Sequence, residues 1–304
     1  MSDESQKSAE ELDRERVLAL DEDMRDMPRE TRNILQPVKL SGKDHMRFRC
    51  HPEISCFNAC CQNVEIVLTP YDLYRLRRRL NLSAETFLHT YAIPTSLAKG
   101  QLPVALIQMD PETGRCPFNR PEGCSVYTDR PVTCRYYPIG MALMRRQETS
   151  SGEDFYFLIK EDFCQGHKEE KRWTIQEWRE DQGSDGYDVQ NRSWMELIIK
   201  RRSAGDMVQT SLPVTEMFYM ASTNPEAMRQ FIFDSSFLRR YQVDPETEEK
   251  IRTNDLALTD FALSWLKSVL FGDSFIPVRP EVFEELKQRR TRQKAEQPTP
   301  DEEP

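Results

Sequence analysis

The feature that most constrains this chain is the clustering of its cysteines. Four of the eight cysteines lie within residues 48–61, and the other four follow within about the next hundred residues. Thiols that serve only as small buried apolar groups would be scattered through the elements of a core. The clustering therefore predicts a metal site, and its candidate ligands are Cys50, Cys56, Cys60, Cys61, Cys116, Cys124, Cys134 and Cys164.

Length and hydropathy set the broad class. The chain has 304 residues, which is enough for one large domain or two smaller ones with an adequate core and no need of disulfides. The start of the sequence holds no apolar segment of the kind found in secretory signals. No apolar run approaches the roughly 20 residues that cross a bilayer. We therefore expect a cytoplasmic protein without membrane association, whose cysteines are metal ligands or free thiols in that reducing compartment.

Charge restricts the partners. The chain carries 42 Lys and Arg against 51 Asp and Glu, a net charge of -9, which disfavours nonspecific binding to a nucleic-acid backbone. The densest basic run is Arg75, Arg77, Arg78 and Arg79. Its expected place on a helix favours a solvated helical face. We expect no nucleic-acid partner.

Composition changes along the chain predict an α+β protein of four parts. We expect a charged N-terminal arm at residues 1–37, a cysteine-cluster metal-binding domain at 38–169, a mostly helical region at 170–291 and a disordered tail at 292–304. The arm and the tail are polar and poor in aromatic residues. Short strands and loops are expected in the cysteine domain, and the apolar spacing beyond it is helical.

Four stretches near the cysteines have the composition of strands. They cover residues 64–68, residues 102–109, and the pair 139–144 and 155–159, which predicts a hairpin ending close to Cys164. The cysteines then lie on loops and at the ends of elements. Metal ligands are common in such places, because a loop can turn several thiolates toward one point while the strands fix its position.

Helix starts are marked at three places. Thr69, followed by a proline, can cap a helix. Thr174 has Glu177 three residues later, the pattern of a capping box. Asp244, also followed by a proline, predicts the start of one long helix that carries the apolar residues of 256–270.

Thiolates restrict the choice of metal. They are soft ligands that select zinc, copper(I) or iron-sulfur clusters. Because a structural zinc or a common iron-sulfur cluster takes about four thiolates, eight cysteines leave open one site with spare thiols or two full sites. The vicinal pair Cys60-Cys61 favours a two-site or bridged arrangement. The sequence has no C-x2-C pair, which disfavours zinc fingers and thioredoxin-like motifs.

Two segments in the second half of this region resemble a known family. They are residues 123–127, Gly-Cys-Ser-Val-Tyr, and residues 129–138, Asp-Arg-Pro-Val-Thr-Cys-Arg-Tyr-Tyr-Pro. With the cysteines of residues 50–61 they resemble the YkgJ-type cysteine-cluster (CxxCxxCC) family, described as zinc- or iron-chelating and related to flagellin lysine N-methylases. The resemblance covers roughly residues 46–167. It implies a zinc or iron-sulfur cofactor, although the first cysteines are here spaced C-x5-C-x3-C-C.

Two arginines flank a cysteine of the second segment. Arg130 and Arg135 are candidate cofactor-binding residues, because a metal held by four thiolates keeps negative charge that a guanidinium can offset or bind through hydrogen bonds to sulfur. The alternative is that Arg130 pairs with a carboxylate such as Asp129 or Glu122. Both interpretations remain open.

Histidine gives weaker evidence. His51 follows Cys50, and His167 lies three residues after Cys164, so either imidazole could replace a thiolate at one metal. A solvent-facing or hydrogen-bonded histidine is the favoured interpretation for each.

Three functions remain open at this level. The first is a metal-binding protein with a structural or redox role. The second, implied by the resemblance, is a protein lysine N-methylase-like enzyme. The chain has 11 glycines and lacks a glycine-rich strand-to-helix turn, which weakens that reading without excluding it, and no catalytic residue is predicted. The third is an interaction module that docks a protein partner through its helical half.

Overall fold

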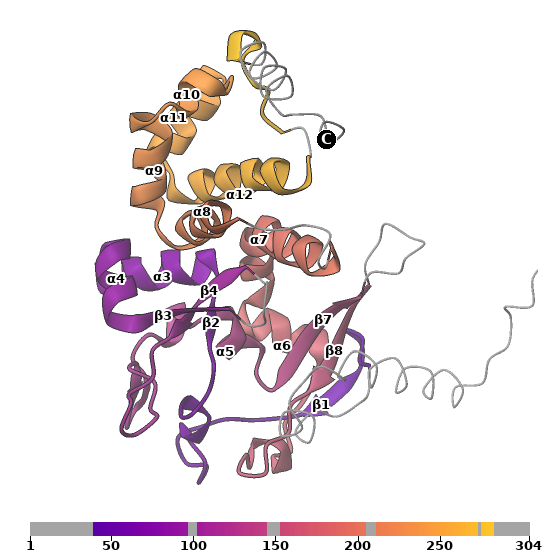
Figure 1. Cartoon of the computed structure of the whole chain (residues 1–304). Coiled ribbons are helices and arrows are strands. Elements are labelled where there is room, and N and C mark those ends of the chain that lie inside the picture. The colour runs from indigo at the N-terminus through magenta and orange to yellow at the C-terminus, as the bar shows by residue number, and fades with distance from the viewer. Residues whose placement is uncertain (1–38, 97–101, 145–152, 205–210, 273–274, 283–304) are drawn as a thin grey trace, which may run out of the picture. The chain divides into compact units, whose positions relative to one another are not determined.

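The computed structural model describes residues 39–96, 102–144, 153–204, 211–272 and 275–282 (Figure 1). The predicted arm at residues 1–37 and the predicted tail at residues 292–304 both lie outside these residues. The expected α+β class is confirmed: the described strands run from β1 (His45–Arg47) to β9 (Arg172–Thr174), and helices predominate after β9.

The chain forms two compact units. The first, here called the cysteine unit, comprises the described parts of Met1–Leu68, Thr90–Ile93 and Leu106–Val189, and the second, the helical unit, comprises those of Thr69–His89, Pro94–Ala105 and Gln190–Pro304. The domain boundaries expected from the sequence stay a prediction.

Two antiparallel pairs of strands frame the cysteine unit. Strand β1 pairs with β9, with Met46 opposite Trp173. Strands β7 (Ile139–Met144) and β8 (Glu153–Leu158) pair along their whole length, which confirms the predicted hairpin. Each pair presents apolar side chains to one common core.

That core is aromatic at its centre. Its buried side chains are Met46, Phe48, Tyr136, Ile139, Tyr156, Leu158, Ile175 and Trp178. The ring of Phe48 lies edge-on to Trp178, with 5.4 Å between centroids, and to Tyr137, with 5.8 Å. Such edge-to-face pairs add to the free energy gained by burial. Because Phe48 stands just before the first cysteine, this packing fixes the start of the cysteine segment.

Helices α5 (Val132–Tyr136) and α6 (Ile175–Gln182) pack on this core. At the start of α6 the Thr174 hydroxyl accepts the Glu177 N–H at 3.1 Å, and the Glu177 carboxylate accepts the Thr174 N–H at 2.7 Å. The predicted capping box is confirmed. Five further short elements carry or adjoin cysteines: η1 (Ala59–Cys61), β5 (Asn119–Arg120), β6 (Gly123–Cys124), η2 (Tyr127–Asp129) and η3 (Gly166–Lys168).

A third sheet has the strand order β2-β4-β3. Its strands are β2 (Val67–Leu68), β4 (Pro103–Ile107) and β3 (Ala92–Ser96). Both strands predicted for this part of the chain are present, with narrower bounds than expected.

Helices make up the helical unit. They are α3 (Pro70–Leu80), α4 (Ala84–Tyr91), the second part of α7 (Ser184–Ala204), α8 (Leu212–Thr223), α9 (Pro225–Asp234), α10 (Phe237–Arg240), α11 (Pro245–Thr253) and α12 (Asp255–Phe271). The expected cap of α3 is confirmed, because Thr69 accepts the Asp72 N–H at 3.2 Å. The helices in the described ranges are all too short or too polar to cross a bilayer.

The prediction of one long helix after Asp244 is wrong. The chain makes two helices, because Asn254 adopts an extended conformation between α11 and α12. Its side-chain oxygen accepts the N–H groups of Leu256 and Ala257 at 2.9 and 3.0 Å. Asparagine is a strong N-cap, so the apolar spacing that continues across it gave a misleading signal.

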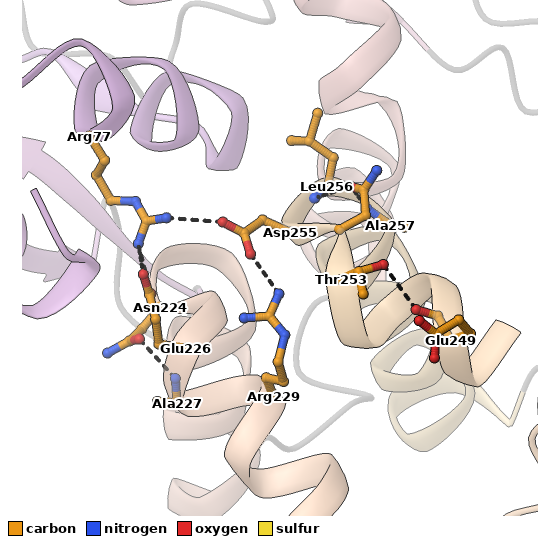
Figure 2. Close-up of polar contacts among 11 residues, drawn as sticks. Arg77, Asn224, Glu226, Ala227, Arg229, Glu249, Thr253, Asp255, Leu256 and Ala257 are labelled. Atoms are coloured by element: carbon orange, nitrogen blue, oxygen red, sulfur yellow. Dashed lines mark hydrogen bonds and ion pairs between the residues drawn. The ribbon is translucent and has the colours of Figure 1, made fainter. Parts of the chain in front are cut away.

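The expectation of a solvated basic face on α3 is wrong for Arg77. This side chain is only 5% exposed, and its guanidinium binds the Glu226 carboxylate at 2.7 and 2.8 Å and Asp255 at 3.2 Å. Arg229 binds the other oxygen of Asp255 at 2.6 Å, so two arginines and two carboxylates alternate (Figure 2). This network joins α3, α9 and α12 within the helical unit. Arg78 and Arg79 are exposed.

Candidate metal centre

All eight cysteines line a single cavity of about 600 Å³ in the cysteine unit. The turns after β1 carry Cys50 and Cys56, η1 carries Cys60 and Cys61, the loop before β5 carries Cys116, β6 carries Cys124, α5 carries Cys134, and the loop before η3 carries Cys164. None of these eight cysteines forms a disulfide. The structure thus brings together, around one space, every cysteine that the sequence singles out.

Backbone hydrogen bonds hold the vicinal pair against the loop of Cys116. The Cys116 N–H donates to the Cys61 carbonyl at 2.9 Å, and the Asn63 N–H donates to the Gly114 carbonyl at 2.9 Å. The Asn58 side-chain amide donates to the Arg120 carbonyl at 2.9 Å. Segments more than fifty residues apart in the sequence therefore lie side by side.

A second set of hydrogen bonds holds the first cysteines against Cys164. The Arg49 N–H donates to the Gly166 carbonyl at 3.1 Å. The Gln165 N–H donates to the Cys56 sulfur at 3.2 Å, which places the residue after Cys164 against Cys56. An N–H pointed at sulfur stabilises a thiolate and is a common feature around metal-bound cysteines.

Partial burial disfavours ionisation of four of the thiols in the metal-free protein. It is the main cause that raises the pKa of Cys50 to about 11, and it also raises the pKa values of Cys116, Cys124 and Cys164. The pKa of Cys60 is raised chiefly by its hydrogen bond with Cys61. A metal cation reverses this preference, because it binds the thiolate and displaces the proton.

Arg130 reaches the cavity wall. Its guanidinium donates to the Tyr127 carbonyl at 2.6 Å and to the Gln182 side chain, and it lies 4.0 Å from the centre of the Tyr127 ring. Burial is the main cause that lowers its pKa, and the nearby thiols Cys134 and Cys124 act in the opposite direction. A cation is therefore held close to two of the candidate ligands.

Arg135 has a different environment. Its guanidinium donates to the carbonyls of Gln182 and Thr128 at 2.6 Å each, to the Arg130 carbonyl at 3.1 Å and to the Tyr187 hydroxyl at 3.0 Å. It is not one of the described residues that line the cavity. These bonds tie the backbone before Cys134 to the end of α6, which is a supporting position. The cofactor role assigned to both arginines stays a prediction.

Sequence reasoning interpreted Tyr137 as a core residue around the site and missed its partner at the cavity, Glu161. The Tyr137 hydroxyl donates to the Glu161 carboxylate at 2.9 Å, and both residues line the cavity. Burial and then a hydrogen bond with Cys164 raise the pKa of Tyr137. The sequence signal for Glu161 was weak. It consisted only of its position three residues before Cys164, in a segment that is polar throughout. Together they place a hydrogen-bonded pair beside that thiol.

The two histidines differ. His167 lies within 3.0 Å of the Ile159 carbonyl through Nε2, as expected for a hydrogen-bonded residue. His51 lines the cavity, with its ring nitrogens 3.7 Å from Glu53 and 3.5 Å from Glu169. Neither nitrogen of His51 makes a hydrogen bond.

The donor set fits zinc or iron chemistry, but its atoms are not gathered into a closed ligand shell. Within the described residues, no three His, Cys, Asp or Glu side chains are grouped so that they could hold a metal ion. Metal binding therefore requires rotation of thiol side chains toward one another. Eight thiols around one cavity supply the soft donors that zinc and iron-sulfur clusters select.

Comparison with known proteins agrees with this donor set. Residues 49–174 match the model of the CxxCxxCC family, which is described as "Putative zinc- or iron-chelating domain". This part of the chain is thus similar to the CxxCxxCC domain, in agreement with the resemblance noted in the sequence. The matched segment contains all eight cysteines of the chain. Searches of curated proteins and of solved structures found no match.

Gly114 is expected to be indispensable to the loop of Cys116. Its φ is +67°, and a Cβ atom there would lie 1.8 Å from the Asn63 side-chain oxygen. We expect Gly114→Ala to lower the free energy of unfolding by about 1–3 kcal/mol, the usual cost of a strained backbone position. Urea denaturation measures the change.

Gly186→Ala is the matched control. Gly186 lies in α7, and an added Cβ would meet nothing within 4 Å. Alanine there should stabilise the protein by roughly 0.5–1 kcal/mol, since glycine is unfavourable inside a helix. Equal effects of the two substitutions would contradict the account of this turn.

Proposed function

We propose that the cysteine unit is a metal-binding domain whose cavity thiolates hold zinc or an iron-sulfur cluster, and that the metal has a structural role. The observation that carries this proposal is the convergence of all eight cysteines on one cavity. They come from separate loops joined by few regular elements. A metal that binds several of them would cross-link those loops, as structural zinc does in small domains.

The surroundings support thiolate ligation. The Gln165 N–H already points at the Cys56 sulfur, and Arg130 lies near Cys124 and Cys134. A centre with four thiolates carries net negative charge, which a buried guanidinium offsets. Bound zinc would supply fixed geometry, and a bound iron-sulfur cluster would add electron transfer.

Metal and sulfide analysis of the full chain purified without oxygen tests the proposal. We expect zinc or iron in stoichiometric amounts. Zinc without acid-labile sulfide identifies a structural site, whereas iron with equal sulfide identifies a cluster and opens the redox role. Protein that binds neither metal after incubation with each, under reducing conditions, would overturn the proposal.

The cysteines also suggest a compartment. None of the eight forms a disulfide, which suits a reducing environment, and we propose that the protein is cytoplasmic. The lysine N-methylase-like activity and the docking of a protein partner stay predictions, since the first is supported by the resemblance and the second by the helical half alone.

A further inference from the structure

The chain that leaves α5 and the chain that leads to Cys164 run side by side. Strands β7 and β8 pair along their whole length. One step beyond this hairpin, the Ile159 N–H donates to the Pro138 carbonyl at 2.8 Å. The backbone that follows α5, the helix of Cys134, is therefore held beside the backbone that enters the turn of Cys164.

A side-chain hydrogen bond continues this contact. Tyr137 follows α5 directly, and its hydroxyl donates to the Glu161 carboxylate at 2.9 Å. The Glu161 carbonyl accepts the Cys164 N–H at 2.9 Å, which closes the turn that carries this cysteine. Glu161 is thus bonded through its side chain to Tyr137 and through its backbone to Cys164.

The other end of the same segment returns to its start. Nε2 of His167 lies 3.0 Å from the Ile159 carbonyl oxygen. This contact closes residues 159–167 into a loop, here called the Cys164 loop. The thiol of Cys164 is therefore carried by a segment with fixed ends, and its turn is attached to α5 through one hydroxyl–carboxylate bond.

The Cys164 loop also contacts the segment of another candidate ligand. The Gln165 N–H donates to the Cys56 sulfur at 3.2 Å, and the Gly166 carbonyl accepts the Arg49 N–H at 3.1 Å. These bonds place the loop against the first cysteines of the cavity. Groups that orient a metal ligand from outside the coordination shell commonly change metal affinity by about 10–100-fold when they are removed.

We propose that Tyr137 and Glu161 are positioning residues of the metal site, which hold the turn of the Cys164 loop so that the Cys164 thiolate faces the cavity. Both side chains line the cavity, but their effect on the metal passes through this thiolate. The inference rests on the proposed metal-binding function and adds two residues that set the affinity of the site.

A double-mutant cycle measured with Co²⁺ on the metal-free full chain, under reducing conditions, tests this role. Tyr137→Phe removes the hydroxyl and keeps the ring, and we expect it to weaken Co²⁺ binding by about 10–100-fold. In a Cys164→Ser background the same change should weaken binding by no more than about threefold, because the ligand that it positions is gone. Equal weakening in both backgrounds, as a general loss of structure would give, overturns the positioning role.

Two further comparisons separate positioning from ligation. Glu161→Gln keeps an oxygen that accepts the Tyr137 hydroxyl and removes the negative charge, so Co²⁺ affinity should stay near that of the wild type. Glu161→Leu should match Tyr137→Phe. Tyr127→Phe, the same change at an exposed tyrosine of the cavity, should have no effect. A loss in Glu161→Gln as large as in Glu161→Leu would overturn the proposal, because the carboxylate would then act through its charge.

Hydrogen exchange in the metal-free protein decides the case in which Cys164→Ser binds no Co²⁺. Tyr137→Phe should speed exchange of the Cys164 N–H, which is bonded to the Glu161 carbonyl, and leave the N–H groups of β7 and β8 as they are in the wild type. Unchanged exchange at Cys164 would overturn the positioning role.

The failures of the two proposals differ. If the wild type binds metal and its affinity does not depend on the Tyr137 hydroxyl, the positioning role is wrong and the metal-binding function stands. If the wild type binds neither zinc nor iron, the function itself fails and this inference fails with it.

Discussion

Cys134→Ser is expected to produce a protein with little metal in the centre that it serves and a cysteine unit that is largely unfolded. Structural zinc contributes on the order of 10 kcal/mol or more of apparent folding free energy, against a net stability of about 5–15 kcal/mol for a typical domain. A metal bound by both Cys61 and Cys116 would close a loop of more than fifty residues between them. Loss of one ligand should therefore be felt throughout the unit.

Metal content and circular dichroism during urea denaturation measure this effect. Cys50→Ser is the matched control, because it is the same chemical change at the exposed cysteine, where the spacing departs from the family pattern. We expect this variant to keep most of its metal and most of its stability. Loss of all metal in Cys50→Ser together with intact binding in Cys134→Ser would show that the ligand assignment is wrong.

The second large effect is expected in the helical unit, at the buried Arg77. Replacing both of its carboxylate partners, in Glu226→Gln with Asp255→Asn, leaves a guanidinium that is 5% exposed without a counter-charge (Figure 2). Breaking a buried ion pair in this way costs about 3–5 kcal/mol. Urea denaturation gives the free energy, and faster hydrogen exchange in α3, α9 and α12 would assign the loss to this unit.

Glu248→Gln provides the comparison. Glu248 pairs with Arg252 at 2.9 Å, and Arg252 is half exposed. The same substitution of carboxylate by amide should change the stability by no more than about 1 kcal/mol, because water replaces the lost partner. Similar losses in the two cases would mean that burial does not set the strength of the Arg77 network.

Local signals predicted much of the fold. The hairpin of β7 and β8, the cap at Thr69 and the capping box at Thr174 all depend on residues close together in the sequence. Each is therefore visible in a short window. The cysteines and the two segments around Cys124 and Cys134 likewise carried the resemblance with which the match of residues 49–174 to the CxxCxxCC family model agrees.

The incorrect or missing predictions have two causes. Some side chains depend on partners that are distant in the sequence, and in one place two local signals compete. Arg77 was expected in solvent because its partners Glu226 and Asp255 lie 149 and 178 positions away. The helix break at Asn254 was missed because the apolar spacing continues past a residue whose side chain caps the next helix. Glu161 was missed at the cavity because its role depends on Tyr137, which is 24 positions away.

X-ray absorption at the edge of the bound metal tests the central claim most directly, since it reports the ligand atoms themselves. The account predicts a first shell of sulfur, at about 2.3 Å if the metal is zinc. A first shell made of nitrogen and oxygen at about 2.0–2.2 Å without sulfur would contradict it, because the metal would then be held by groups other than the cavity cysteines.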